Sequence, residues 1–467
     1  MDGIIFTTIS DMPGFSRNYG PTSIAGILRN HGYKILVVDF FDLLSVEDIR
    51  EIAKKYVTPQ TRFIGFSGSF FTNTHYQKKY VHNAFFRDMT EIFEIFKGIP
   101  ILYGGSNIRA VDTNIPEVDH WFYDDSEGSM LLFLKYPTMF EMLFGRRIVD
   151  SSAYLFQSFH TTPIKWTNED FLFENEVLPL ETRRGCTEKC AFCNRPPERY
   201  STKNLVTIHE ELHANREFTT RYFVVDDMFT DDIDRILKIC CLFKQMKIEW
   251  LCFGRVKFFQ KYPELREVFL ESGCYAVQFG IESMSNKSLR AIHKGPPIEQ
   301  QIETLEFLRE KWKDKIHMSS TFIVGLPYQN LSDIQKTFDR LDEFPLDYGC
   351  PSPLFIAEKG AHADSLMSLN PMKYGYVMGK DGWTSMTSDM TWRKSVEFCS
   401  DFYNNKPLKP FWIFGSRLMN LGYSAKEVYF GDMSFTDEWQ KIWNQKKLDL
   451  FESYKVKLLA NSSNCIY

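Results

Sequence analysis

Three cysteines in one short segment are the residues of this chain best suited to chemistry. Cys186, Cys190 and Cys193 lie within residues 184–200 and have the spacing C-x₃-C-x₂-C. Three thiolates on one tight loop can bind three irons of a cubane [4Fe–4S] cluster, which leaves the fourth iron open to a small molecule. The alternative is a zinc site, which needs a fourth ligand nearby, and the closest histidine, His209, lies well outside the loop.

The composition of the whole chain is that of a globular protein with several domains. The chain has 467 residues, of which 44% are hydrophobic, 25% charged and 16% aromatic. This length predicts about two to four domains. The net charge of −5 gives no basic excess of the kind that marks nucleic-acid binding. None of the ten cysteines lies in the first 185 residues, which argues against an evenly stapled disulfide scaffold.

The sequence offers no targeting or membrane signal. The first residues, MDGIIFTTIS, lack a basic segment followed by a long apolar run, so no signal peptide is expected. No run of 18 apolar residues occurs, so no transmembrane helix is expected either. Together with the cysteine distribution, these features predict a cytoplasmic protein that does not associate with membranes.

Short apolar runs alternate with amphipathic stretches over residues 1–150, which predicts an α/β domain with a doubly wound, Rossmann-like parallel sheet. Ser45 and Asp48 have the spacing of a helix N-cap pair. The expected strands are listed here: Ile4–Ile9, Lys34–Phe40, Phe63–Ser67, Ile99–Tyr103 and Trp121–Tyr123. Ligands of such sheets bind at the carboxyl ends of the strands. The loops that hold candidate binding residues there contain Ser67, Gly68, Gly104 and Gly105.

Residues 151–177 show no clear period and are expected to be a linker. The alternation restarts over residues 178–357, where six βα units predict a partial parallel barrel. The expected barrel strands are Leu178–Arg183, Arg221–Asp226, Ile248–Arg255, Cys274–Ile281, His317–Val324 and Tyr348–Ile356. Residues 358–467 lose the alternation and are expected to form a mainly helical region.

The cysteine segment resembles the hallmark of the radical S-adenosylmethionine (radical SAM) superfamily, with Phe192 at the aromatic position before the last cysteine. Further segments resemble later strands of that family: FVVDDMF, WLCFGR, QFGIES and TFIVGLP. The resemblance implies that the three cysteines bind a [4Fe–4S] cluster whose open iron chelates SAM. The reduced cluster would then cleave SAM to methionine and a 5′-deoxyadenosyl radical, with flavodoxin or ferredoxin as the electron donor.

The same resemblance implies positions that touch SAM. They are Asp226, Asp227, Arg255, Gln278, Glu282, Ser283 and Gly325. Several of these have plain structural alternatives. Asp226 and Asp227 could cap the following helix, Ser283 could be a helix N-cap, and Gly325 could simply end a strand. Cys350 lies near the last barrel strand and is a candidate catalytic hydrogen donor or ligand, with ordinary burial as the alternative.

The domain before the barrel resembles that of the cobalamin-binding subclass of radical SAM enzymes. The segments that carry this resemblance are residues 20–40, FIGFSGSF and ILYGGSN. The loop after the first strand lacks the Asp-x-His-x-x-Gly histidine that often replaces the lower ligand of cobalamin. The resemblance therefore implies a radical SAM enzyme, with cobalamin as a third cofactor, that methylates an unactivated centre or performs a radical rearrangement of a small molecule.

Two alternatives to this function remain open. The first domain could shape the substrate site without binding cobalamin, or the chain could be a non-catalytic iron–sulfur or cobalamin sensor. Methylthiolation of RNA or protein is disfavoured, because the family that performs it has three cysteines in its N-terminal domain and this chain has none there.

Overall fold

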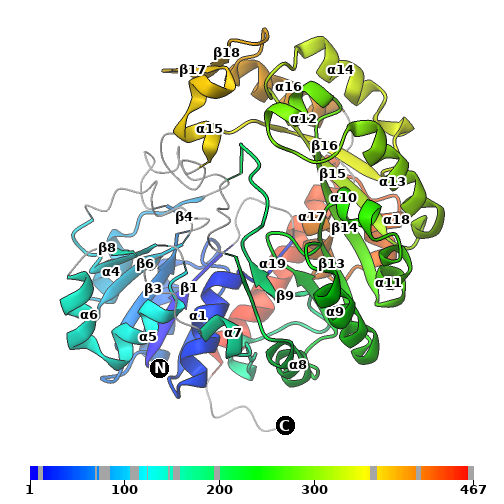
Figure 1. The fold of residues 1–467 in the computed structure, drawn as a ribbon. Coiled ribbons are helices and arrows are strands. Elements are labelled where there is room, and N and C mark those ends of the chain that lie inside the picture. The colour runs from blue at the N-terminus through cyan, green and yellow to red at the C-terminus, as the bar shows by residue number, and fades with distance from the viewer. Residues whose placement is uncertain are drawn as a thin grey trace.

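Two α/β parts lie side by side, and each is built on a six-stranded parallel sheet (Figure 1). The computed structural model describes residues 1–8, 14–68, 71–72, 85–105, 115–123, 125–145, 148–150, 158–193, 200–357, 365–405 and 412–460. The α/β class, the doubly wound first sheet and the partial barrel predicted from the sequence are confirmed.

The N-terminal sheet has the strand order β2-β1-β3-β6-β7-β8. Its strands are β1 (Gly3–Phe6), β2 (Ile35–Val38), β3 (Phe63–Ser67), β6 (Ile101–Gly104), β7 (His120–Tyr123) and β8 (Ile148–Asp150). The order of strands reverses next to β1, and the carboxyl ends of β1 and β3 therefore border the crevice in which doubly wound sheets bind ligands. The short edge strand β8 is an addition to the five predicted strands. A separate two-stranded sheet pairs β4 (Phe71–Thr72) with β5 (Phe85–Phe86).

Helices cover both faces of the N-terminal sheet. One face packs against α1 (Tyr19–Asn30) and α5 (Glu127–Lys135), with α6 (Pro137–Phe144) beyond them. The other face packs against α2 (Val46–Tyr56), α4 (Thr90–Ile95) and the long helix α19 (Asp437–Leu459). The predicted cap of α2 is confirmed, because Ser45 and Asp48 form a reciprocal capping box. The C-terminal helix thus completes the core of the N-terminal domain.

The barrel strands follow one another in sequence order and are all parallel. They are β9 (Leu178–Leu180), β12 (Arg221–Val224), β13 (Glu249–Gly254), β14 (Cys274–Glu282), β15 (His317–Val324) and β16 (Tyr348–Pro353). The helices between them are α8 (Leu205–Ala214), α9 (Ile233–Met246), α10 (Val256–Lys261), α11 (Leu265–Glu271), α12 (Asn286–Ala291), α13 (Ile298–Trp312) and α14 (Leu331–Asp339).

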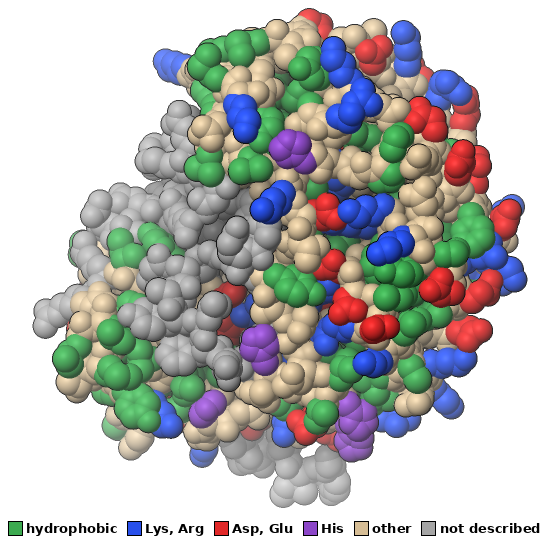
Figure 2. Space-filling view, viewed as in Figure 1, with side chains coloured by type: hydrophobic (Ala, Val, Ile, Leu, Met, Phe, Trp, Pro, Cys, Tyr) green, Lys and Arg blue, Asp and Glu red, His purple; other side chains and the backbone are tan. Residues whose placement is uncertain are grey.

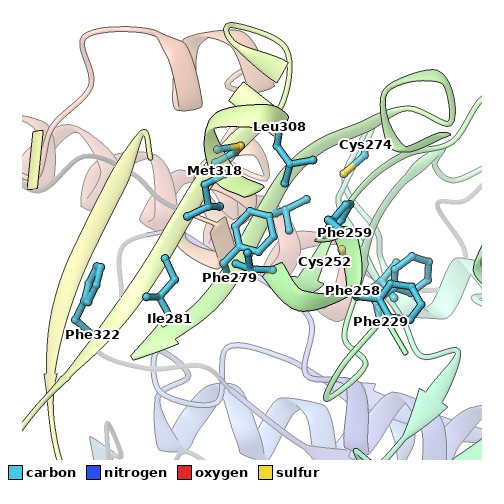
Figure 3. Close-up of a cluster of buried hydrophobic side chains, with 14 of the residues drawn as sticks. Phe229, Cys252, Phe258, Phe259, Cys274, Phe279, Ile281, Leu308, Met318 and Phe322 are labelled. Carbon is cyan, nitrogen blue, oxygen red and sulfur yellow. The ribbon is translucent and has the colours of Figure 1, made fainter. Parts of the chain in front are cut away.

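A single apolar cluster fills the space between the barrel strands and these helices. Figure 3 shows Cys252, Cys274 and Phe279 inside this cluster, each with at most 4% of its surface exposed. Phe279 and Ile281 face the cluster from β14, so the residues that alternate with them face the inside of the barrel. Cys252 and Cys274 are therefore packed as small apolar side chains of this cluster.

The C-terminal region is not purely helical. It contains α15 (Leu366–Leu369), α16 (Trp392–Asn405), α17 (Trp412–Met419) and α18 (Ala425–Phe430), but also a hairpin of β17 (Tyr376–Gly379) and β18 (Gly382–Ser385). Short helical pieces also occur before the barrel, at α7 (Ser158–Thr161) and a 3₁₀ turn at Asn168–Asp170. Apolar residues of α17 and α18 pack on β13 and β14, which covers part of the barrel with C-terminal chain.

The outer surface shows mixed charge on the side drawn in Figure 2, where Lys, Arg, Asp and Glu side chains intermingle over the barrel half. Within the residues that the structure describes, no helix is both long and apolar enough to cross a bilayer.

A buried ion-pair network joins the N-terminal domain to the segment before the barrel. Arg17 Nη1 contacts Asp39 Oδ2 at 2.5 Å, and Arg17 Nε donates to Glu176 Oε1 at 2.9 Å. The main-chain N–H of Asp39 donates in turn to the hydroxyl of Tyr454 on α19, at 2.9 Å. Burial raises the pKa of Asp39 to about 6, although Arg17 opposes this shift. Arg17 therefore joins Asp39 to Glu176, and Asp39 in turn binds α19.

Replacement of Arg17 by Met leaves Asp39 and Glu176 buried without their cation. We expect the free energy of unfolding to fall by about 3–5 kcal/mol. Urea titration followed by tryptophan fluorescence measures the change. In the control, Arg221→Met removes a partner of the exposed Glu249 and should cost less than about 1 kcal/mol. Similar small losses in both variants would show that the buried network contributes little.

Candidate functional site

The three cysteines lie on a loop that starts and ends in a short antiparallel pair. β10 (Arg183–Arg184) pairs with β11 (Ser201–Thr202), and the loop runs between them. Cys186 and Cys190 are buried and Cys193 is half-buried. Of the loop, residues 194–199 lie outside the described chain. The pairing brings both ends of the loop to one place, so the thiols are held close to the barrel mouth.

Carboxylates at the end of β12 fix the start of this loop. Asp226 is 1% exposed and accepts hydrogen bonds from the main-chain N–H groups of Thr182 and Arg183, at 2.6 and 3.0 Å, and from the Thr182 hydroxyl at 2.5 Å. Asp227 accepts a hydrogen bond from the N–H of Gly185 at 2.9 Å. The structure thus gives both carboxylates a positioning role, and contact of either with SAM remains a prediction.

Cationic side chains surround the thiols. Arg255 Nη2 lies 2.7 Å from Cys186 Sγ, and its Nη1 lies 2.5 Å from Glu188 Oε1. Lys294 Nζ lies 5.8 Å from the ring centroid of Phe192. Burial opposes the charge of Lys294, but Glu282 and Cys190 outweigh it and raise its pKa. These cations can balance the negative charge of thiolates that bind metal.

Glu282 lies where β14 ends, as predicted, and faces the inside of the barrel. Its main chain is left-handed, with a φ of 69°, and its Oε1 is 3.1 Å from Lys294 Nζ. Ser283 does not cap a helix, because α12 begins at Asn286 with Ser285 as its N-cap. Instead the Ser283 hydroxyl accepts a hydrogen bond from Gln329 Nε2 at 3.0 Å. Glu282 and Ser283 line a cavity of about 210 Å³ between β14, β15 and α14.

Gly325 is held from three sides. Its N–H donates to Gln329 Oε1 at 3.0 Å, and its carbonyl accepts from the Tyr376 hydroxyl at 2.7 Å. A Cβ atom at Gly325 would lie 2.3 Å from the ring of Trp383, and its φ is 101°. Glycine is therefore required here for the packing of the β17–β18 hairpin. A role of Gly325 toward the adenine of SAM stays a prediction.

Two further candidates have buried polar atoms with no partner in the described chain. Gln278 is 5% exposed, faces the inside of the barrel, and its Oε1 accepts no hydrogen bond. Arg255 Nε is also buried and donates none. Buried polar atoms without partners are costly, which fits a ligand that supplies the missing bonds.

Cys350 lies on β16 and is 2% exposed. Its Sγ is 3.9 Å from the carbonyl of Ser320. Burial raises its pKa to about 12, while a hydrogen bond with Tyr403 on α16 opposes the rise. The thiol is therefore protonated at neutral pH, and a catalytic role for it remains untested.

A cavity of about 340 Å³ lies between the N-terminal domain and the start of the cysteine loop. Its N-terminal wall includes Ser67, Gly104 and Gly105 of the predicted set, whereas Gly68 does not line it. Deeper in the cavity the lining is largely apolar and comes from β1, β3, β6, β7, α1 and α5: Ile5, Ile24, Phe63, Leu102, Phe122 and Met130. The opposite wall contains Arg184 and Asp227, beside the cysteine loop.

Arg184 connects the two walls of this cavity. It forms ion pairs with Glu127 of α5, with Glu181 at 2.9 Å and with Asp125 at 3.5 Å. Burial raises the pKa of Glu181 to about 7, and Arg184 opposes the rise. Tyr19 of α1 lines the N-terminal wall of the cavity. Its hydroxyl is buried and makes no hydrogen bond in the described chain.

The residues present fit the groups that the sequence implies. Three thiols with cationic neighbours suit a cluster, and the orphaned atoms of Gln278 and Arg255 lie at the predicted SAM positions. Among the described residues, no three His, Cys, Asp or Glu side chains converge in the way needed to hold a single metal ion. Lys294, Gln329 and Arg184 were not predicted from the sequence. Only their contacts in the folded chain show that they lie at the site.

Burial controls the ionisation of the cysteine thiols. It raises the pKa of Cys190 to about 11, although Lys294 lowers it, and the nearby thiols Cys193 and Cys186 add to the rise. Burial also raises the pKa of Cys186 against the opposing charge of Arg255. Since the thiolate is the nucleophile and metal ligand, the metal-free protein should react slowly at neutral pH.

In the metal-free protein, we expect the alkylation rate of Cys190 to rise about tenfold per pH unit up to roughly pH 10, because thiolate is the reactive form. Iodoacetamide labelling with peptide mass spectrometry measures the rate. Cys241, which is exposed on α9, calibrates the reagent. A plateau at pH 8 to 9 would contradict the raised pKa.

Comparison with known proteins agrees with this geometry. Residues 180–341 match the model of the radical SAM superfamily. Over 174 residues the chain is 29% identical to an uncharacterized methyltransferase, PH0819, of Pyrococcus horikoshii, covering 36% of this chain and 37% of that protein. The aligned parts span only 35–39% of the length of three curated methyltransferases.

Solved structures match nearly the whole chain at low identity. The radical SAM methyltransferase TsrM from Kitasatospora setae has a TM-score of 0.59 and 14% identity, covering 86% of this chain and 83% of its own. The cobalamin-dependent SAM radical enzyme OxsB has a TM-score of 0.53 and 14% identity, covering 98% of this chain and 72% of its own. Residues 180–341 therefore form a domain that matches the radical SAM superfamily, and the overall fold of the chain is similar to the folds of TsrM and OxsB.

Proposed function

We propose that this chain is a cobalamin-dependent radical SAM methyltransferase that acts on a small molecule. The observation that carries the proposal is the cavity of about 340 Å³ that opens between the N-terminal sheet and the cysteine loop. Its two walls belong to the two domains that such a reaction must join. The methyltransferases among the relatives and the folds of TsrM and OxsB support the same reaction class.

Cys186, Cys190 and Cys193 would hold a [4Fe–4S] cluster, and the barrel mouth beside them would hold SAM. Glu282, which pairs with Lys294, would accept a hydrogen bond from a ribose hydroxyl, and the unpartnered Nε of Arg255 would bind a carboxylate. When bound, the cluster with SAM supplies reductive bond cleavage, and the corrinoid supplies a transferable methyl group. The residues of this chain orient these groups and exclude water.

The cavity would hold the corrinoid at the carboxyl ends of β1, β3 and β6. Gly104 and Gly105 leave room for close approach of a large ring, and a Cβ atom at Gly20 would meet no other atom within 4 Å. The deeper apolar lining suits a flat aromatic group such as the benzimidazole of cobalamin. The hydroxyl of Tyr19 and the carboxylate of Glu127 can pair with amide side chains of the corrin.

Neither of two competing functions uses the whole site. A domain that only shapes the substrate pocket does not require a cavity that reaches between the sheet and its helices. A non-catalytic sensor does not require Glu282, Arg255 and Gln278 around the barrel mouth. The reaction also needs a one-electron donor, for which a flavodoxin or ferredoxin is the proposed partner.

The enzymatic part of the proposal is tested by the products of SAM cleavage. After anaerobic reconstitution, we expect about four irons per chain, and SAM with a strong reductant should yield 5′-deoxyadenosine and methionine. A Cys186→Ala, Cys190→Ala, Cys193→Ala variant should lose both the iron and the products. An intact, reducible cluster that yields no 5′-deoxyadenosine would overturn the enzymatic proposal.

The corrinoid site is tested by filling the cavity. Gly65 lines the cavity, and a Cβ atom there would meet only ordinary contacts, at 3.5 Å or more from Ile5 and Phe63. We expect Gly65→Val to weaken hydroxocobalamin binding at least tenfold, because its methyl groups occupy the cavity.

Absorption titration of the corrinoid measures this affinity. Gly65→Ala should have a smaller effect, and iron content should stay unchanged in both variants. Unaltered corrinoid binding in Gly65→Val, with the fold intact, would place the corrinoid elsewhere.

A further inference from the structure

Arg255 places its guanidinium between two residues of the cysteine loop. Its Nη2 atom lies 2.7 Å from Cys186 Sγ, and its Nη1 atom lies 2.5 Å from Glu188 Oε1. The same carboxylate oxygen lies 2.5 Å from Nζ of Lys257. Arg255 therefore donates a hydrogen bond to the sulfur of a predicted cluster ligand, while Glu188 binds the other branch of the guanidinium and a second cation.

The contact between Arg255 and Cys186 is fixed on both sides. Arg255 lies between β13 and α10, and its main-chain N–H donates to the buried hydroxyl of Thr230 at 2.7 Å. On the loop, the hydroxyl of Thr187 donates to Asp231 Oδ1 at 2.9 Å. The side chain of Arg255 is only 11% exposed, so its place beside the sulfur is set by the fold.

A cation in this position changes how easily an iron–sulfur cluster accepts an electron. Hydrogen bonds to the ligand sulfur atoms and nearby positive charge both favour the more negatively charged, reduced form of a cluster. Because the guanidinium of Arg255 is mostly shielded from water, solvent weakens its effect less than that of a surface cation. Arg255 therefore raises the reduction potential. The carboxylate of Glu188, held against the same guanidinium, acts in the opposite direction.

We propose that Arg255, acting through Cys186, is a positioning residue that raises the reduction potential of the cluster, and that Glu188 limits this rise by offsetting part of its charge. The inference rests on the proposed function, because it requires a [4Fe–4S] cluster on the three cysteines. In the step concerned, one electron passes from an external one-electron donor to the cluster. The donor is oxidised, the cluster is reduced, and no covalent bond of the protein changes.

This role is separate from the predicted contact of Arg255 with SAM. The nitrogen that has no partner in the described chain and is offered to a carboxylate is Nε, whereas the nitrogen that faces Cys186 is Nη2. A measurement made without SAM therefore reports the sulfur contact alone.

Potentiometric titration of the reconstituted full-length protein, without SAM, tests the proposal. Electron paramagnetic resonance of samples poised with dithionite measures the ratio of reduced to oxidised cluster. Arg255→Met should lower this ratio about tenfold at a fixed potential, which is a fall of about 59 mV for a one-electron couple. Arg255→Lys keeps the charge but not the planar fork, so its ratio should lie between those of Arg255→Met and the wild type.

Glu188→Gln should shift the potential the other way. Loss of the carboxylate leaves the charge of Arg255 without this offset, so the ratio of reduced to oxidised cluster should rise about threefold at the same potential. Lys257→Met is the matched control. Lys257 pairs with the same oxygen of Glu188 but is 48% exposed, and water and salt screen its charge. Its loss should change the ratio less than about twofold.

Iron content decides how each result is interpreted. A complete cluster with the wild-type potential in Arg255→Met would overturn the proposal, as would a fall of the potential in Glu188→Gln. If Arg255→Met does not bind iron, the direction of the shift in Glu188→Gln, which retains Arg255, decides the question. A wild type that binds no iron overturns the proposed function and this inference with it, whereas an unshifted potential in a complete cluster overturns only the role of Arg255.

Discussion

Compensation of buried charge determines where the cysteine loop lies. The loop starts beside Asp226, which accepts three hydrogen bonds from Thr182 and Arg183, and the Arg183 side chain pairs in turn with Asp231. Asp226, Thr182 and Arg183 are each at most 1% exposed, so each of them needs its partner, and loss of one leaves another unpaired. The short β10–β11 pair then brings the two ends of the loop together.

The same constraint joins the loop to the N-terminal domain. Arg184 is adjacent to Arg183, but it pairs with Glu127 of α5 and with Glu181 on the cavity wall. A residue two positions before the first cysteine therefore contacts the space proposed for the corrinoid. On the far side of the sheet, α19 completes the core and Tyr454 binds the main chain of Asp39. The two domains are thus fixed to each other from both sides.

Much of this architecture was predictable, because parallel strands buried on both faces give continuous apolar runs. The strands at Phe63–Ser67 and His317–Val324 were predicted with the bounds that the structure shows. The edge strand β8 and the β17–β18 hairpin were missed, because strands of three or four residues are too short to show a clear period. The position of α19 could not be foreseen either, because its sequence does not specify which surface it covers.

Some of the site residues could be predicted from the sequence, and others could not. The cysteines were recognised by spacing and Glu282 by its place at the end of an apolar strand. Lys294 and Gln329 come from segments with no motif and were missed, since only folding brings them to Glu282 and Ser283.

The buried polar groups of this molecule are of two kinds. Some make all their hydrogen bonds within the chain and serve structure, whereas others lack a partner in the described chain. Asp226 has every partner it needs within the chain, which explains its position without reference to a ligand. Gln278 and Tyr19 each retain a buried polar atom with no partner among the described residues, and natural proteins rarely leave such atoms unpaired. Gln278 faces the inside of the barrel and Tyr19 lines the cavity between the domains. Ligands that enter these two places are therefore a natural source of the missing bonds.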